Sequence, residues 1–486
     1  MAITADRLSP TARRLVPSLA DLLFVALLLT QAQPSLFSDA DTGWHLWSGA
    51  QVLAHGPGPR PDTFSYGRVG APWQSPQWLG EAVLAWIHRH GGWTALALFC
   101  SALFAATCAW TYRRAFARSQ HAPWALVLTL LAALVIWPHL LARPVVFAYP
   151  LFLAALALAQ SERPGPRVAL GLGALAALWA NLHPTAPLVV VVAVLAWGGR
   201  PRERWLLIGA ALALLALGAT PSGFGWLAGM MPTGGNRLLF AGIDEWKSPQ
   251  FREPRYWALL VALLLAIGAR ARGGPLARGE RGAGLLWIAA ALLAVRFAPF
   301  GALAWTPRLA ADLAGDPATR KSRGPWAELD RTTRPFEQAL RPGVWALVAG
   351  AAALILAPSL ARWMPEVARG FPARDFPLAA LAQADQRALG PRALTSYGWG
   401  GWLGFASSGR YRPYLDGRAG FFSGPVLDDY LTLSRLHPGW EPALARAAPD
   451  WMLLPRELPL AVAAPLTGRW RTVWSDSAAA ILVPVR

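Results

Sequence analysis

The stretch LVPSLADLLFVALLLTQAQPSLFSDAD, Leu15–Asp41, places a long apolar run directly before two aspartates. Three arginines among residues 7–14 precede the run, which lacks a convincing small-residue cleavage site. About 17 apolar residues approach the length of a membrane span. We therefore expect an uncleaved first transmembrane helix, with Asp39 and Asp41 at the point where the chain leaves the bilayer. A cleaved signal peptide is the alternative.

The composition indicates a membrane protein over the whole chain. Of its 486 residues, 55% are hydrophobic and only 15% are charged, and apolar runs recur along most of its length. This predicts a polytopic membrane protein in contact with a lipid bilayer. The formal charge of +18 lies mainly in short loops between apolar runs, so it reports topology, and no nucleic-acid partner is expected. Cys100 and Cys108 lie in one apolar run and predict no disulfide framework.

Eleven runs are candidate transmembrane helices, within a range of ten to thirteen because several are short. They cover about Leu15–Gln33, Trp93–Tyr112, Pro123–Leu141, Val145–Gln160, Val168–Asn181, Thr185–Trp197, Trp205–Ala219, Tyr256–Ala269, Leu285–Phe297, Phe300–Leu313 and Val344–Leu360.

Loop charge orients these candidate spans. With the N-terminus inside, every second loop is basic, as cytoplasmic loops are expected to be. The domain prediction is a transmembrane part over residues 1–360, with a large outer loop at 34–92, and an extracytoplasmic part over residues 361–486. Asp39, Asp41 and this last part then share the outer side of the membrane.

The last part differs in pattern. Short strand-like pieces, ALTSYGWGGWLGF, YRPYLDGR, DWMLLP and AAAILVPV, alternate with Gly, Pro and Asp turns, which predicts a small α/β domain. In the outer loop, PQWLGEAVLAWIHRH has the apolar periodicity of an amphipathic helix that lies in the membrane interface.

Two acids one residue apart are the first candidates for chemistry. Asp39 and Asp41 can converge on a divalent cation such as Mg²⁺ or Mn²⁺, or one of them can accept a proton from an attacking hydroxyl. Capping of the helix that begins near Thr42 is an equally good interpretation. Asp62, in PRPDTFSYG, fits a turn aspartate better than a ligand.

Other polar residues stand at the outer ends of the candidate helices. Trp44 can stack on the face of a sugar, and His45 can contact a hydroxyl or a phosphate. The alternative is an interfacial Trp beside a surface His. Arg143 and Arg296 suit a lipid-linked phosphate, and snorkelling to headgroups is the alternative. His183 is a candidate for substrate contact or for capping its helix.

A second pair of outer acids, Asp244 and Glu245, has Lys247 beside it, so that an ordinary surface ion pair is a strong alternative. The sequence has no Walker loop, GxSxG, HExxH or CxxC pattern. No nucleotide or organic cofactor is expected.

Several segments together resemble the GT-C superfamily of membrane glycosyltransferases. The outer-loop sequence DADTGWHLWSGAQVLAHGPGPRPDTFSYGRVGAPWQSPQWLGE is similar to their first outer loop, and ARPVVFAYPLF, ANLHPTAPLV, DEWKSPQFREP and RFAPFGALAWTPRLA follow in the same order. The resemblance covers most of the chain. It implies transfer of a sugar from a polyprenyl-phosphate or polyprenyl-diphosphate carrier, with inversion, and it gives Asp39 and Asp41 the role of base or metal ligand.

The tail carries a further resemblance. SYGWGGWL, residues 396–403, is similar in placement to the WWDYG signature of oligosaccharyltransferase catalytic subunits, but Gly398 stands where that signature has aspartate. This departure argues against sequon glycosylation. Asp416 and Arg418, in YLDGR, are candidates for acceptor binding, and a plain Asp-Gly turn is the alternative.

The sequence therefore predicts an α-helical polytopic membrane protein with a small outer α/β domain, acting as a glycosyltransferase in the inner membrane of a bacterium. The expected partners are a polyprenyl-linked sugar donor and an acceptor of unknown class. A transporter of lipid-linked glycans is one alternative, although the candidate spans are nearly free of charge. A non-catalytic scaffold of envelope assembly is the other.

Overall fold

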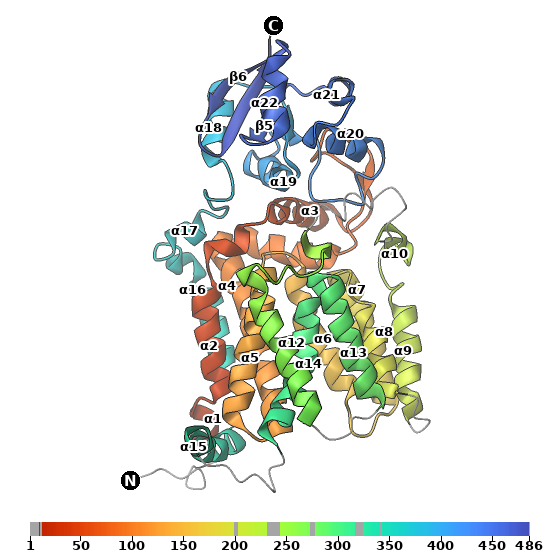
Figure 1. Ribbon diagram of the computed structural model, residues 1–486, viewed down its shortest axis with the longest axis vertical. Coiled ribbons are helices and arrows are strands. Elements are labelled where there is room, and N and C mark those ends of the chain that lie inside the picture. The colour runs from red at the N-terminus through yellow and green to blue at the C-terminus, as the bar shows by residue number, and fades with distance from the viewer. Residues whose placement is uncertain are drawn as a thin grey trace.

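The computed structural model describes residues 9, 12–198, 203–230, 244–272, 278–315, 324–340 and 343–485. It has two parts (Figure 1): a bundle of helices, and a smaller sheet-containing part that holds the C-terminus. Helix α1, Ala12–Leu15, lies at the opposite end of the bundle from the sheet. Helix α3 lies between the two parts, so the first outer loop is placed at their junction.

Each predicted span corresponds to a helix of the bundle. These helices are α2 Leu19–Gln31, α4 Trp78–Ser119, α5 Ala122–Ile136, α6 Val145–Ala159, α7 Pro166–Leu182, α8 Leu188–Trp197, α9 Arg204–Ala216, α12 Trp257–Arg272, α13 Arg278–Leu293, α14 Ala298–Ala314 and α16 Val344–Leu360.

Helix length gives a smaller number of membrane spans than the predicted eleven. Among the described residues, Trp78–Ser119 and Ala122–His139 are long and apolar enough to cross a bilayer. A third span results if α15 Pro325–Ala339 and α16, which meet at a bend of 78°, are counted together. Membrane crossing by the shorter apolar helices remains a prediction.

Helix α4 is broken at Gly92, whose φ of 64° and ψ of −165° lie outside the helical region. A positive φ is readily adopted only by glycine. The part before the break, from Trp78 onward, is the helix predicted from PQWLGEAVLAWIHRH, and its helical conformation is confirmed. The long apolar span follows the break.

Shorter elements complete the bundle. At its sheet end, the first outer loop contains η2 Pro34–Phe37, α3 Asp41–His55 and an antiparallel pair of β1 Arg60–Pro61 with β2 Pro72–Trp73. The remaining pieces are α1 Ala12–Leu15, η3 Trp137–His139, α10 Gly225–Met230, η5 Asp244–Trp246, η6 Pro254–Tyr256 and η7 Val295–Phe297.

The C-terminal part contains a five-stranded mixed sheet in the order β4-β3-β5-β7-β6. Strand β3 runs parallel to β4 and β5, and β7 runs antiparallel to β5 and β6. The strands are β3 Arg392–Thr395, β4 Arg412–Pro413, β5 Trp451–Pro455, β6 Trp470–Ser475 and β7 Ala479–Pro484, and the helices are α17 Pro365–Ala368, α18 Leu378–Gln386, α19 Tyr397–Ala406, α20 Pro425–Ser434, α21 Trp440–Ala447 and α22 Pro459–Leu466.

The strand predictions for DWMLLP and AAAILVPV are confirmed. The strand prediction for ALTSYGWGGWLGF is confirmed for its first residues and is wrong from Tyr397 onward. The chain leaves β3 at Thr395 and enters helix α19. Four glycines give this segment a poor intrinsic helix propensity. Packing overrides that propensity, because Trp402 and Leu403 are buried and the glycines allow α19 to lie directly against α3, as described below.

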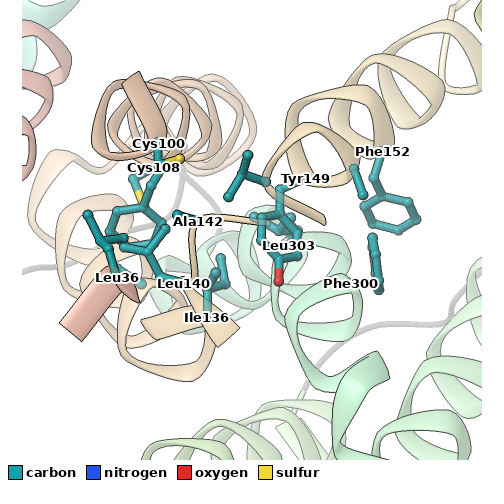
Figure 2. Packing of buried hydrophobic residues seen from close by; sticks show 14 of the residues in the cluster. Leu36, Cys100, Cys108, Ile136, Leu140, Ala142, Tyr149, Phe152, Phe300 and Leu303 are labelled. Atoms are coloured by element: carbon teal, nitrogen blue, oxygen red, sulfur yellow. The ribbon is translucent and has the colours of Figure 1, made fainter. Parts of the chain in front are cut away.

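The bundle core is apolar and closely packed (Figure 2). The rings of Phe152 in α6 and Phe300 in α14 lie edge to face with 5.1 Å between their centroids. Cys100 and Cys108 are both buried in α4 and free. Close packing of such side chains gives the van der Waals contacts that stabilise association of helices, in a membrane as in water.

Candidate active site

A cavity of about 1130 Å³ lies where the bundle meets the C-terminal part. Its wall combines residues of the first outer loop, the outer helix ends, Tyr397 at the start of α19 and Gly417. It gathers eight of the ten residues singled out from the sequence: Asp39, Asp41, Trp44, His45, Arg143, His183, Arg296 and Arg418.

The two acids meet at one arginine. Arg143 Nη1 lies 2.8 Å from Asp39 Oδ2 and 3.4 Å from Asp41 Oδ2. Asp39 also accepts a hydrogen bond from the backbone N–H of Asp41, over 2.8 Å, at the start of α3. Asp39 therefore supports the start of α3 with one oxygen, although Ala40 is the N-cap residue, and its other oxygen pairs with Arg143.

A third carboxylate binds the same arginine. Arg143 Nη2 donates to Glu245 Oε1, so both terminal nitrogens of the guanidinium are bound by acids. The positive charge of Arg143 lowers the pKa of Glu245 to about 2. Burial alone lowers the pKa of Arg143, but the three carboxylates raise it well above its usual value. The side chain of Asp244, the other predicted outer acid, lies outside the described residues.

Asp41 is the unusual acid of this cluster. Burial and the neighbouring charge of Asp39 raise its pKa to about 7, against the opposing effect of Arg143. The buried indole Nε1 of Trp44 makes no hydrogen bond of normal geometry, although it lies near enough to favour the charged carboxylate. A carboxyl with a pKa near 7 is suited to accept a proton at neutral pH.

The C-terminal part covers this cluster through a glycine. A Cβ atom at Gly417 would lie 1.7 Å from Asp41 Oδ1, so no larger residue fits without displacing the acid. The hydroxyl of Tyr397 donates to the carbonyl of Gly417 over 3.2 Å. The tail therefore forms one wall of the cavity directly at Asp41.

Helices α3 and α19 also meet through glycines. A Cβ atom at Gly43 would lie 2.2 Å from the carbonyl oxygen of Gly401, and one at Gly401 would lie 2.3 Å from that of Ala40. The GWGGW sequence thus packs α19 against α3. Gly398, which stands in the place of the signature aspartate, instead lines the cavity, with open space where a Cβ would be.

His45 is held by Glu81, a buried acid of α4. Its Nδ1 lies 2.8 Å from Glu81 Oε1, and Ser48 Oγ donates to Glu81 Oε2 over 2.6 Å. Glu81 is completely buried. The rings of Trp44 and His45 contact each other, with 3.6 Å between centroids.

The other side of the cavity carries nitrogen donors. Arg296 lies over the ring of Trp246, 4.2 Å from its centroid, and it forms no ion pair with a described residue. His183 Nδ1 lies 2.8 Å from Thr185 Oγ1 and accepts from the backbone N–H of Thr185 over 3.3 Å. Arg296 and His183 both line the cavity, where an anion can reach them.

Asp62, Asp416 and Arg418 form a separate buried ion cluster. Arg418 Nε and Nη2 donate to Asp416, over 2.8 and 2.7 Å, and Nη1 donates to Asp62 over 2.9 Å. All three side chains have essentially no exposed surface. Five aromatic rings surround the guanidinium: Trp47, Phe64, Trp73, Phe421 and Phe422.

This cluster corrects the predicted substrate contacts of Asp62, Asp416 and Arg418. Although Arg418 borders the cavity, its guanidinium is used within the protein, and the two aspartates do not line the cavity. Asp62 and Asp416 also accept hydrogen bonds from backbone N–H groups two or three residues further along the chain, as the turn interpretations expect, but neither lies on an acceptor-binding surface. They join the PRPDTFSYG turn of the first outer loop to the YLDGR segment of the tail.

The donor set does not fit the predicted metal. Within the described residues, no group of three or more His, Cys, Asp or Glu side chains could hold an ion. Magnesium can be bound through two carboxylates and substrate phosphates, but here Arg143 Nη1 bridges Asp39 and Asp41. We therefore use no metal in the proposal below.

Sequence reasoning missed Glu81 and the contact between Glu245 and Arg143. Glu81 was recognisable as the one carboxylate inside the apolar helix 78–87, where an acid is out of pattern. Glu245 was noted, with an ion pair to Lys247 as a strong alternative. Nothing in the local sequence indicates that Arg143, 102 residues away, is the partner.

The comparisons with known proteins add no name: no protein-family model matches this chain, and no curated protein matches its sequence.

Proposed function

We propose that this protein is a polytopic membrane glycosyltransferase of GT-C type, which transfers a sugar from a polyprenyl-linked donor to an acceptor hydroxyl. The single observation that carries the proposal is Asp41. Its carboxyl group, with a pKa near 7, borders a large cavity that is also lined by Arg296, which has no carboxylate partner among the described residues.

The bundle surface supports a membrane location. Large apolar side chains are exposed on the outer faces of α2, α9, α12, α13 and α16, where a water-soluble protein would carry polar residues. Examples are Leu22, Leu29, Leu214, Leu215, Leu264, Ile267, Leu285, Leu293, Leu347 and Ile355.

The positions of the basic loops support the predicted orientation of the protein in the membrane. Arg114, Arg118, Glu162 and Glu203, from three basic loops or their helix ends, border a second cavity of about 720 Å³, which shares no residue with the first. Basic loops face the cytoplasm. The cavity with Asp41 then opens on the outer side of the inner membrane of a bacterium, where polyprenyl-linked sugars are used according to the resemblance.

The chemistry requires one proton acceptor and stabilisation of a leaving phosphate. The acceptor oxygen forms a bond to the anomeric carbon and gives its proton to the carboxylate of Asp41. The bond from that carbon to the carrier phosphate breaks, and its electron pair leaves with the phosphate oxygen. Arg296, which has no carboxylate partner among the described residues, stabilises the charge that develops there. Arg143 and Asp39 hold Asp41 in place.

Transfer of labelled sugar from a bacterial membrane-lipid pool to acceptor material tests the proposal. Asp41→Asn should reduce transfer by about 10²–10⁴-fold, because Asn cannot accept the proton. Asp39→Asn should also abolish it. The matched control is Asp428→Asn, which alters an exposed aspartate of α20. Thermal unfolding of each variant in detergent separates loss of chemistry from loss of fold.

Two results would contradict the proposal. One is a wild-type protein that transfers nothing from any donor in the pool, which favours the transporter or the scaffold. The other is Asp41→Asn protein that transfers as well as wild type, which removes Asp41 from the reaction.

A further inference from the structure

Glu81 is a buried acid that the proposed transfer does not use. It lies in the first part of α4, and both carboxylate oxygens accept hydrogen bonds from α3, one from His45 and one from Ser48. His45 and Ser48 are three residues apart and so lie on the same face of α3. The close contact depends on Gly49, because a Cβ there would lie 2.1 Å from the carbonyl oxygen of Glu81.

The hydrogen bond to Glu81 selects one form of His45. A carboxylate can only accept, so Nδ1 carries the proton. Burial lowers the pKa of His45, although Glu81 opposes this, so the ring is mainly neutral. In a neutral ring protonated at Nδ1, Nε2 is an acceptor with a free lone pair.

Of the pair formed by Glu81 and His45, the histidine borders the cavity. His45 lines the cavity and Glu81 does not, so the ring separates the buried acid from the open space. Trp44 covers one face of the imidazole and limits its rotation. In the described residues, no hydrogen bond to Nε2 is formed.

We propose that Glu81 is a positioning residue, which holds His45 as the Nδ1–H tautomer so that Nε2 accepts a hydrogen bond from a substrate hydroxyl in the cavity. This proposal rests on the proposed glycosyltransferase function. It adds a second hydroxyl contact to the site, on the same helix as Asp41 and one turn further along it. Ser48 completes the arrangement by satisfying the second oxygen of Glu81.

The tautomer can be measured without turnover. In ¹⁵N-histidine-labelled protein, the ring-nitrogen shifts distinguish Nδ1–H from Nε2–H, and loss of a signal pair in His45→Gln assigns His45 among the eight histidines. Wild type should show Nδ1–H. Glu81→Gln should move the ring toward Nε2–H, because the new amide can donate to Nδ1. Ser48→Ala keeps the carboxylate and should leave the tautomer unchanged.

The transfer assay then tests the substrate contact. Glu81→Gln and His45→Gln should each lower transfer at least about tenfold, as expected when a hydroxyl contact is lost or misdirected. Glu81→Asp, which retains a carboxylate, should recover part of the loss. The control is His55→Gln, at the exposed end of the same helix. Unfolding temperatures close to wild type show that the variants fold.

Three results would overturn the proposal. A wild-type ring protonated at Nε2, or on both nitrogens, removes the role of Glu81. If Glu81→Gln changes the tautomer but leaves the transfer rate unchanged, Nε2 of His45 does not contact the substrate. A wild type without any transfer overturns the glycosyltransferase function and the substrate contact with it, while the tautomer measurement still decides separately whether Glu81 positions His45.

Discussion

Two clusters in this protein are built from the same residue types, carboxylates around one arginine, and they have opposite properties. Around Arg418, two buried aspartates use the guanidinium nitrogens, and aromatic rings exclude water. Around Arg143, three partly exposed carboxylates share one guanidinium at the wall of a cavity. In the second cluster the negative groups outnumber the positive one by two, and the pKa of Asp41 rises.

The difference shows why the residue types alone do not define a site. The buried ion cluster of Arg418 joins two segments, and its guanidinium donates to protein carboxylates. At Arg143, burial and the neighbouring charge of Asp39 raise the pKa of Asp41 to about 7, and this carboxyl group borders a cavity. Four predictions test this contrast, from the largest expected effect to the smallest.

Arg418→Met should produce the largest effect, a loss of about 3–5 kcal/mol of unfolding free energy, because Asp62 and Asp416 remain buried without a counter-charge. Chemical or thermal unfolding in detergent measures it. Arg435→Met removes an exposed arginine of the same part of the chain and should change stability little. A loss below about 1 kcal/mol for Arg418→Met would mean that the buried cluster is not the joint that we describe.

Gly417→Ala should act on the open cluster instead. The new methyl group collides with Asp41 Oδ1, so we expect transfer to fall by about 100-fold, as when a catalytic group is misplaced by about an ångström. Gly398→Ala is the matched control, because its Cβ enters open space and transfer should stay near wild type. Equal activities of the two variants would show that the tail does not position Asp41.

Asp41→Asn should increase stability at alkaline pH. The folded-state pKa of about 7 lies above the ordinary 3.8, so the folded protein holds this proton more tightly and wild-type stability falls as pH rises from about 4 to 7. Asparagine carries no charge, so the variant does not lose stability through ionisation of this buried side chain. The variant should therefore be more stable than wild type by up to about 4 kcal/mol at pH 8.

Unfolding temperatures measured from pH 4 to pH 8 follow this difference, which should vanish toward pH 4. Asp428→Asn, at an exposed position, should show no such trend. A difference between Asp41→Asn and wild type that is constant with pH would indicate an ordinary pKa for Asp41.

Glu245→Gln should have the smallest effect. Loss of this carboxylate leaves Arg143 more available to Asp41, which lowers the pKa of Asp41. The acidic limb of the transfer rate should then move to lower pH by less than about one unit. Glu441→Gln, an exposed substitution in α21, serves as the control. A shift to higher pH would contradict the sharing of Arg143.

Three examples show which features the local sequence predicts and which it does not. Leu19–Gln31 and the other apolar runs were predicted as helices because hydrophobic periodicity and length are properties of neighbouring residues. Helix α19 was missed because its glycines are unfavourable in an isolated helix, and only their contact with α3 explains them. The ion pair of Asp62 was missed because its partner Arg418 is 356 positions away.

The sequence by itself determined the order of the apolar helices, the basic loops between them and the place of Asp39 and Asp41 after the first one. These features depend on local composition and on the transfer of apolar groups from water. The tertiary structure decided that Arg143 binds acids at the wall of the cavity and that Arg418 binds acids in a buried cluster. Ion pairing and burial depend on distances in space, and residues such as Arg143, Glu245 and Arg418 acquire their pKa values only from partners that folding brings beside them.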